Sequence, residues 1–435
     1  MQRAAGLALL VAFAAPRGPA AERPNFVLCM TDDQGWGDVS YNGLTAAKTP
    51  NLDEMAASGL RFNRFYAAAP VCSPTRGSFL TGRHPNRYGV FLYGYPLRPQ
   101  EKTVAQALRA AGYATGHFGK WHLNGVSGPG KPIPADDPLH PGKFGFDEWL
   151  SVSNFFDLDP AMSRNGTAVE LKGDGSDLIA EEAAGFFARS AAAKKPFLAV
   201  VWFGNPHTPH RALPADKEKA GGSDYLGEIV GIDRAMGRLR AELRRLGVAE
   251  NTLVWFTSDN GAQGPGSTGG LRGKKGSVWE GGVRVPGIVE WPARIRKPAT
   301  TDVPAVTSDI YPTIAEILGL ARPGWVEPID GVSLVPLFDG RMAERPRPIG
   351  FWHVSPKKGG EKGLARQDGQ AAWTGNRYKL HRPAAGKVEL YDLVADPAEK
   401  TDLAGSKPDV VAALQAELEA WQDSVLKSFR GEDYR

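Results

Sequence analysis

The chain has 435 residues, of which 42% are hydrophobic and 23% are charged. This composition is ordinary for a globular protein and excludes extended disorder, collagen-like repeats and coiled-coil rods. The 52 basic and 48 acidic residues leave a formal net charge of +4, too small to indicate nucleic acid as a partner. The length suits a large domain followed by a smaller one. The two cysteines, Cys29 and Cys72, exclude a disulfide scaffold.

Residues 1–21 have the pattern of a signal peptide. Arg3 precedes the short apolar run Leu7–Ala15, and small residues follow up to Ala21. The run is too short to span a bilayer, and no later segment of about 18 uncharged apolar residues occurs. We therefore predict a secreted or periplasmic protein without a membrane partner. An uncleaved anchor or a disordered leader is the alternative.

Apolar runs that recur along residues 22–340 predict strands buried on both faces of a sheet. A helix is expected between the last two runs, because apolar residues from Ile229 to Leu246 fall on one stripe and Gly247 follows. This order predicts an α/β sandwich. The runs are 25–30, 113–118, 196–203 and 252–257.

The pattern changes over residues 341–435. A stretch rich in Pro and Arg precedes short strand candidates at 371–373, 377–381 and 388–391. A closing helix is expected from the apolar face that runs from Val411 to Val425. We predict a smaller C-terminal α+β domain. The glycine-rich segment 261–276 is typical of a flexible surface loop.

Polar residues follow each predicted strand of the large domain. Because ligand sites of open α/β sheets lie beyond the carboxyl ends of the strands, these residues should converge. Four of them, Asp32, Asp33, Asp259 and Asn260, offer hard oxygen atoms, which favour Ca²⁺ or Mg²⁺ over Zn²⁺. Each pair taken alone is also typical of a turn or a helix cap. The segments are Asp32-Asp33, Lys120-Trp-His122, Asn205-Pro-His207 and Ser258-Asp-Asn260.

Cys72 is expected at the N-terminus of a short helix, because Pro74 and Gly82 frame the segment. The backbone N–H groups and the dipole at such a position favour an anion. A buried, inert cysteine is one alternative. A thiol nucleophile with His122 or His207 as its base is another.

These residues resemble a known family. Cys72-Ser-Pro-Thr-Arg76, with Leu80-Thr-Gly-Arg83, is similar to the signature of the formylglycine-dependent (type I) sulfatases. The resemblance implies an alkaline-phosphatase-like fold, with a large, mostly parallel mixed sheet between helices, and a sulfuric ester hydrolase. It covers nearly the whole chain in family order, through residues 25–28, 32–33, 119–123, 206–207, 258–261, 276, 280–286, 389–393 and 396–397.

The resemblance also implies a role for each site residue. A maturation enzyme would oxidise Cys72 to formylglycine, whose hydrate attacks the sulfur atom. Asp32, Asp33, Asp259 and Asn260, with the modified Cys72, would bind Ca²⁺, and Arg76 would hold the hydrate. Lys120, His122 and Lys275 would bind the sulfate oxygens, and His207 would protonate the leaving alcohol. Lys275 is preferred to Lys274 because the family's lysine directly precedes a glycine.

The expected function is hydrolysis of a sulfate ester on a carbohydrate or another small molecule. A phosphonate or phosphate ester hydrolase of the same fold and a non-catalytic glycan-binding relative are the alternatives. Ser153 is a further candidate for positioning the site. The segment Phe351–Arg366 is either a solvated linker or a loop over the pocket, with Trp352 against a sugar face and His353 near the substrate.

Overall fold

The computed structural model describes residues 23–320, 324–354, 361–365 and 368–434. The predicted signal peptide, residues 1–21, lies outside the described residues, as do residues 355–360 and 366 of the predicted loop. Among the described helices, none is both long and apolar enough to cross a membrane.

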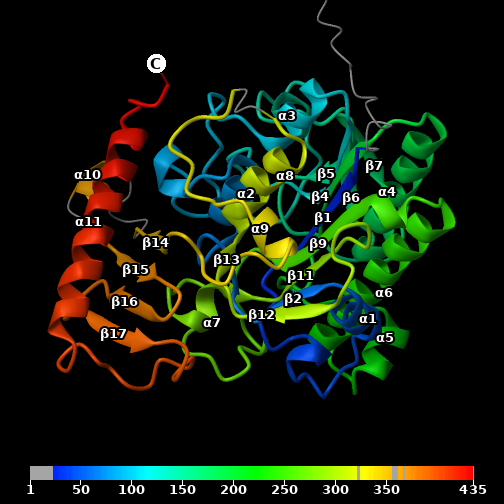
Figure 1. The fold of residues 1–435 in the computed structure, drawn as a ribbon. Coiled ribbons are helices and arrows are strands. Elements are labelled where there is room, and N and C mark those ends of the chain that lie inside the picture. Colours follow the sequence, from blue (N-terminus) through cyan, green and yellow to red (C-terminus); the bar gives the residue numbers. More distant parts are fainter. Residues whose placement is uncertain (1–22, 321–323, 355–360, 366–367, 435) are drawn as a thin grey trace, which may run out of the picture.

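A ten-stranded sheet forms the centre of the large domain (Figure 1). Its five central strands are parallel, and antiparallel pairs lie toward both edges. This arrangement confirms the predicted mixed, mostly parallel sheet. In spatial order the strands are β12 (Ala299–Thr301), β2 (Leu60–Phe62), β11 (Gly287–Glu290), β9 (Thr252–Ser258), β1 (Asn25–Thr31), β8 (Phe197–Trp202), β4 (Ala114–Lys120), β5 (Glu148–Val152), β6 (Ala161–Arg164) and β7 (Thr167–Glu170).

Helices cover both faces of this sheet, so the central strands are buried at nearly every position. Val27 and Cys29 of β1 face one helical layer, whereas Phe26 and Leu28 face the other. The first layer contains α1 (Pro50–Ser58), α4 (Gly175–Ala192), α5 (Pro214–Lys219) and α6 (Asp224–Arg245). The second contains α2 (Cys72–Thr81), α3 (Val104–Ala110), α8 (Ile310–Ile317) and α9 (Val335–Phe338). The predicted helix before Gly247 is confirmed as α6.

Shorter elements connect these layers. The three strands β10 (Arg284–Val285), β3 (Phe65–Tyr66) and β13 (Ala305–Val306) form a small second sheet. Helix α7 (Glu280–Val283) directly precedes β10. Single 3-10 turns lie at Ser40–Asn42, Pro85–Tyr88, Pro141–Phe144, Ala249–Asn251 and Thr307–Asp309.

A four-stranded antiparallel sheet with a long closing helix forms the C-terminal domain, on the left of Figure 1. Helix α11 packs on this sheet through the apolar face that the sequence predicts. The elements are β14 (Ile349–His353), β15 (Gln370–Thr374), β16 (Tyr378–Arg382), β17 (Glu389–Asp392), α10 (Glu361–Ala365) and α11 (Pro408–Phe429).

Neither alternative for the segment Phe351–Arg366, the solvated linker or the loop with Trp352 against a sugar face, holds for residues 351–353, which belong to β14. Trp352 belongs to β14, is 3% exposed, and packs in the core of the C-terminal domain with Leu418 and Val425. Its indole Nε1 donates to the carbonyl of Asp368 at 2.9 Å. The neighbouring Phe351 faces the large domain instead. Because both faces of β14 are covered, the segment has no polar–apolar alternation to mark it as a strand.

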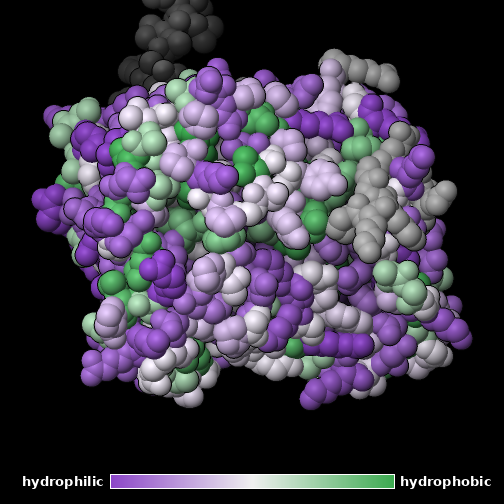
Figure 2. Space-filling model, turned by 180° about the vertical axis from the view of Figure 1, so that it is seen from behind, coloured by the Kyte–Doolittle hydropathy of each residue, from purple (hydrophilic) through white to green (hydrophobic). Residues whose placement is uncertain are grey.

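The outer surface is polar. On the face turned away from the viewer in Figure 1, hydrophobic side chains are scattered among hydrophilic ones (Figure 2). Of the large hydrophobic side chains in the described ranges, only Tyr93 and Val394 are exposed. Scattered exposed residues of this kind are normal for a globular protein, so function has to be sought in buried polar groups.

Candidate active site

The carboxyl ends of four neighbouring strands bring the predicted site residues together. Asp32 and Asp33 follow β1, Lys120 ends β4, and Asp259 follows β9. Backbone bonds tie these ends to each other: the Asp32 N–H donates to the Asn205 carbonyl at 3.1 Å, and the Asp259 N–H to the Thr31 carbonyl at 3.1 Å. The parallel order of the strands therefore places residues that are far apart in sequence at one edge.

Three buried carboxylates lie at the centre of this edge, each in an ion pair with a different cation. Their side chains are at most 2% exposed. The pairs are Lys120 Nζ with Asp32 Oδ2 at 2.5 Å, Lys275 Nζ with Asp33 Oδ1 at 2.6 Å, and Arg76 Nη2 with Asp259 Oδ2 at 2.7 Å. Buried charges are stable only when they are paired in this way.

Two buried oxygen atoms of the cluster have no hydrogen-bond donor, namely Asp32 Oδ1 and Asn260 Oδ1. The amide nitrogen of Asn260 donates to Asp33 Oδ1 at 2.8 Å, so its carbonyl oxygen points to the other side. Buried acceptors without a donor are rare, and carboxylate and amide oxygens are the ligands of Ca²⁺ and Mg²⁺. The donor set of Asp32, Asp33, Asp259 and Asn260 therefore fits a hard divalent cation.

The charges of the cluster shift the pKa values of its carboxyl groups. Burial raises the pKa of Asp32, but Lys120, His207 and Arg76 outweigh this effect and hold it well below its usual range. Burial and the negative charge of Asp32 raise the pKa of Asp259 above its usual range, although Arg76 opposes them. A bound cation would relieve this repulsion between carboxylates.

Cys72 is the first residue of α2 and lies against the carboxylates. Its Sγ and one oxygen each of Asp32 and Asp259 lie within 4.8 Å of one another. Helix α2 ends at Thr81, and Gly82 follows with a φ of 73°, as the sequence predicts. Burial raises the pKa of the Cys72 thiol, although Lys120 and Lys275 oppose it. Since the thiolate is the nucleophilic form, this environment disfavours an unmodified thiol as nucleophile.

Cys29, in contrast, lies in the middle of β1 among apolar side chains. It is fully buried, and burial alone raises the pKa of its thiol. Both cysteines are free, so no disulfide joins them.

His122 presents an imidazole without a hydrogen-bond partner at the same edge. Both ring nitrogens are buried and unpaired. Burial, Lys120 and Arg76 hold the pKa of His122 well below its usual range, which favours the neutral ring. Its backbone φ of 54° lies in the left-handed region, as does that of Asp33 at 67°. Such strained non-glycine residues concentrate at functional sites.

His207 is held by a ring stack and by one hydrogen bond. Its imidazole stacks on Phe155, with 4.5 Å between ring centroids and 14° between planes. Nδ1 lies 2.5 Å from the carbonyl of Thr208, which can only accept, so Nδ1 carries the hydrogen. Nε2 is left facing Asp33 Oδ2 at 3.7 Å. The nearby His210 pairs with Glu228 at 3.3 Å.

The two predicted lysine alternatives point in different directions. Lys275 reaches Asp33 and also donates to Gln263 Oε1 at 3.0 Å. Lys274 instead donates to the carbonyls of Gly264 and Gly266 at 2.7 and 3.1 Å. The glycine-rich segment is thus folded onto the site rather than being a free surface loop. Lys275 and His207 are the most exposed residues of the cluster, at 14% and 15%, so the site opens beside them.

Three further residues complete the surroundings. The sequence analysis did not predict Phe155 or Gln263. The position of Gln263, four residues after Asp259, could have indicated it, whereas no sequence signal marks Phe155. The hydroxyl of Ser153 accepts from the Lys131 N–H at 2.9 Å, and its carbonyl accepts from the His122 N–H at 3.0 Å. Ser153 therefore contacts the cluster through its backbone.

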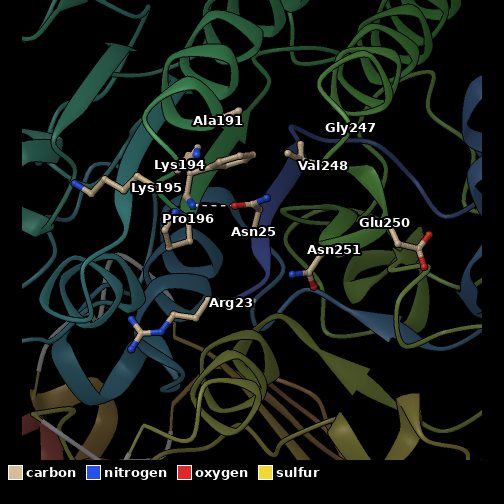
Figure 3. A pocket seen from close by; sticks show the side chains of 11 residues that line it. Arg23, Asn25, Ala191, Lys194, Lys195, Pro196, Gly247, Val248, Glu250 and Asn251 are labelled. Carbon is tan, nitrogen blue, oxygen red and sulfur yellow. Dashed lines mark hydrogen bonds between the residues drawn. The ribbon is translucent and has the colours of Figure 1, made fainter. Parts of the chain in front are cut away.

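A separate pocket of about 590 Å³ lies at the opposite, amino edge of the sheet (Figure 3). Arg23, Lys194 and Lys195 line it, and Asn25 Oδ1 accepts from the Phe197 N–H at 3.1 Å within it. Among its described lining residues, none has a buried side-chain polar atom without a partner. This pocket therefore lacks the features that mark the carboxyl edge.

Comparison with known proteins assigns these features to one family. Residues 24–320 match the family described as "Sulfatase", and residues 273–424 match "N-sulphoglucosamine sulphohydrolase, C-terminal". The chain is 34% identical to the steryl-sulfatase of Mus musculus over 76% of this chain and 68% of the relative. It is 30% identical to the ulvan-active sulfatase of Formosa agariphila over 95% and 83%. A solved structure of Ps i-CgsB in complex with k-i-k-neocarrahexaose is 27% identical, with a TM-score of 0.82 over 92% of this chain and 93% of that one.

Proposed function

The chain belongs to the sulfatase family and is a sulfuric ester hydrolase, and from this premise we propose that it cleaves sulfate esters of carbohydrates with a formylglycine made from Cys72 and a bound Ca²⁺. The observation that carries the proposal is the placement of Cys72 beside buried carboxylates and unpaired oxygens. The carboxylates of such a site can bind a hard cation. The positive charge of that cation would then attract the anionic ester.

The bound metal ion and the modified Cys72 would have different roles in the reaction. When bound, Ca²⁺ would stabilise negative charge on the sulfate, held by Asp32, Asp33, Asp259 and Asn260. Formylglycine, as its hydrate, would supply the attacking oxygen that the disfavoured Cys72 thiol does not.

The chain's own side chains would bind and orient the ester. Lys120 and Lys275 are each paired with a carboxylate, and on binding of a cation their ammonium groups become free to bind sulfate oxygens. The neutral ring of His122, which burial favours, would donate its one N–H to a sulfate oxygen. Arg76, which also donates to the Lys120 carbonyl at 3.2 Å, fixes this end of β4 and orients the hydrate.

His207 would protonate the leaving oxygen. The carbonyl of Thr208 holds its Nδ1–H, so Nε2 carries the transferable proton of the charged ring. Burial lowers the pKa of His207, although Asp32 opposes it, and a lower pKa makes the charged ring a stronger acid. Its place at the open side of the cluster suits contact with the alcohol part of the substrate.

The carbohydrate assignment is supported by relatives whose names specify sulfated glycans, such as the ulvan-active sulfatase. Steryl-sulfatase makes a steroid sulfate the second candidate substrate. A panel of sulfated mono- and oligosaccharides, a steroid sulfate, an aryl sulfate and matched phosphate esters tests both. We expect desulfation of at least one saccharide at a higher kcat/KM than the steroid. Turnover of phosphate esters with all sulfates ignored would overturn the proposal.

We also propose export to the periplasm or the exterior, on the basis of the sequence of residues 1–21. N-terminal sequencing of the protein recovered outside the cytoplasm should begin close to residue 22. Recovery of uncleaved chain from the cytoplasm alone would contradict this assignment.

A further inference from the structure

The C-terminal sheet contacts the segment 272–280, which carries Lys275. This contact joins two domains that the sequence separates by a Pro/Arg-rich stretch. It matters because Lys275 is a proposed sulfate-binding residue, and the C-terminal domain supplies no other side chain that the catalytic cluster uses among the described residues.

Gln370, the first residue of β15, makes the contact nearest to the lysine. Its Nε2 donates to the carbonyl of Gly276 at 2.9 Å, and its Oε1 accepts from the Val278 N–H at 3.2 Å. One amide side chain thus bonds to the backbone twice within three residues of Lys275. The Gly276 carbonyl and the Val278 N–H are thereby paired by a side chain instead of by another backbone segment.

The other side of the same turn is held by the large domain. The Lys275 N–H donates to the Ala262 carbonyl at 3.1 Å, and the Gly276 N–H donates to the Pro70 carbonyl at 2.9 Å. Pro70 lies two residues before Cys72, so this hydrogen bond links the backbone next to Lys275 to the backbone next to Cys72. Gly276 has a φ of 86°, a conformation that favours glycine. The turn is therefore fixed between the Cys72 segment and Gln370.

The ends of the segment are held by larger contacts. Arg272 Nη1 donates to the Tyr391 hydroxyl and to the Glu399 carbonyl, each at 3.1 Å. At the other end, Lys379 is fully buried and pairs with Glu280 at 3.0 Å and with Glu399 at 2.8 Å. Loss of these groups would leave buried charges unpaired and destabilise the whole interface. Gln370 is partly exposed and uncharged, so its hydrogen bonds can be removed selectively.

We propose that Gln370 is a positioning residue for Lys275, through which the C-terminal sheet sets the place of the sulfate-binding ammonium group. This inference rests on the proposed function of Lys275. A lysine side chain is flexible, so the position of its backbone decides whether the ammonium group reaches the sulfate. Small misplacements of a binding group cost up to about a hundredfold in rate.

The test uses the formylglycine-bearing enzyme, a minimal aryl sulfate and inorganic sulfate as a competing ligand. Gln370→Met keeps the volume of the side chain and removes both hydrogen bonds. We expect the inhibition constant of sulfate and the KM of the aryl sulfate to rise by about three- to tenfold, with a smaller change in kcat. Gln370→Ala serves the same purpose if the methionine variant does not fold.

A double-mutant cycle separates positioning from general damage. In a Lys275→Met background, Gln370→Met should add no further loss of sulfate binding, because the group it positions is already absent. Gln422→Met is the matched control: Gln422 is a buried amide of α11 that accepts from Arg382 at 3.0 Å. It should lower Tm and leave the sulfate inhibition constant unchanged.

Two results would overturn the proposal while leaving the function of Lys275 intact. One is an unchanged inhibition constant in Gln370→Met when Lys275→Met weakens sulfate binding. The other is an equal loss from Gln370→Met with and without Lys275. If Lys275→Met itself leaves sulfate inhibition unchanged, the proposed role of Lys275 fails, and the positioning role fails with it.

Discussion

The two edges of the central sheet differ in whether their charged side chains are buried or exposed to solvent. At the carboxyl edge, three carboxylates are buried together with Arg76 and Lys120, and the metal-site oxygens Asp32 Oδ1 and Asn260 Oδ1 lack donors. At the amino edge, Lys194 and Lys195 are exposed to solvent around an open pocket. Solvated charges interact weakly, whereas desolvated charges interact strongly with a bound ion. Desolvated, incompletely paired groups therefore distinguish the proposed active edge from the amino edge, where a pocket of about 590 Å³ is lined by solvated charges.

The largest expected effect separates the two cysteines. Cys72→Ala should lower kcat by at least about ten-thousandfold, since it removes the nucleophile, and should leave Tm nearly unchanged. Cys29→Ala should keep full activity and lose about 1–2 kcal/mol of stability through the small cavity it creates in the core. Rates on an aryl sulfate and thermal melts provide the readouts. Substantial turnover by Cys72→Ala would refute the nucleophile assignment.

Removal of divalent cations should have the next largest effect. Loss of several kcal/mol of charge stabilisation corresponds to about a thousandfold in rate. Ca²⁺ should restore activity, and at about a hundred times its Kd it should add about 2.7 kcal/mol of stability. Asp32→Asn should abolish the thermal shift caused by Ca²⁺. An unchanged shift in that variant would remove Asp32 from the metal site.

His207 should matter most for poor leaving groups. His207→Ala should reduce the rate on a saccharide sulfate by about a hundredfold or more, because an alkoxide needs protonation on departure. An activated aryl sulfate should suffer much less. His210→Ala is the control, since His210 pairs with Glu228 and with no residue of the cluster among the described contacts. Equal losses on both substrates would argue against the role of His207 as the acid.

The smallest effects should come from the amino edge. Lys195→Ala should leave activity unchanged and alter stability by no more than about 0.5 kcal/mol, because the side chain is exposed. Lys275→Ala at the carboxyl edge should lower kcat/KM by about a hundredfold. A clear loss of activity in Lys195→Ala would show that the edges do not differ as described.

The sequence predicts four of the five central parallel strands of the large domain, β1, β4, β8 and β9, and their polar ends, because both depend on local patterns. The shorter strands of this domain and β5 carry no long continuous apolar run and are not predicted. Continuously apolar runs mark β1, β8 and β9, and acidic residues follow β1 and β9 directly. The cluster could thus be assembled from the rule that parallel strands present their carboxyl ends together. The family resemblance adds the roles of the side chains, which no periodicity reveals.

Contacts between the two domains could not be predicted in this way. Gln370 bonds to a backbone 94 residues away, and such a pair leaves no periodic signal in either segment. The same holds for β14, where one face packs on the large domain and the other on α11. The glycine-rich segment suggests mobility only if these tertiary contacts are ignored.

The burial of α2 bears on the order in which the chain folds and Cys72 is modified. All ten residues of this helix are buried, and Cys72 is 2% exposed, so a second enzyme cannot reach the thiol once the domain has folded. Under the proposed formylglycine chemistry, oxidation of Cys72 would have to occur before the domain folds, so the two processes would compete in rate. Under this proposal, chains that fold before oxidation would be folded but inactive, and the specific activity of a preparation would measure the fraction of chains oxidised in time. Slowing synthesis or folding while the maturation enzyme is present should raise the oxidised fraction measured by mass spectrometry, whereas adding the enzyme to folded thiol protein should not.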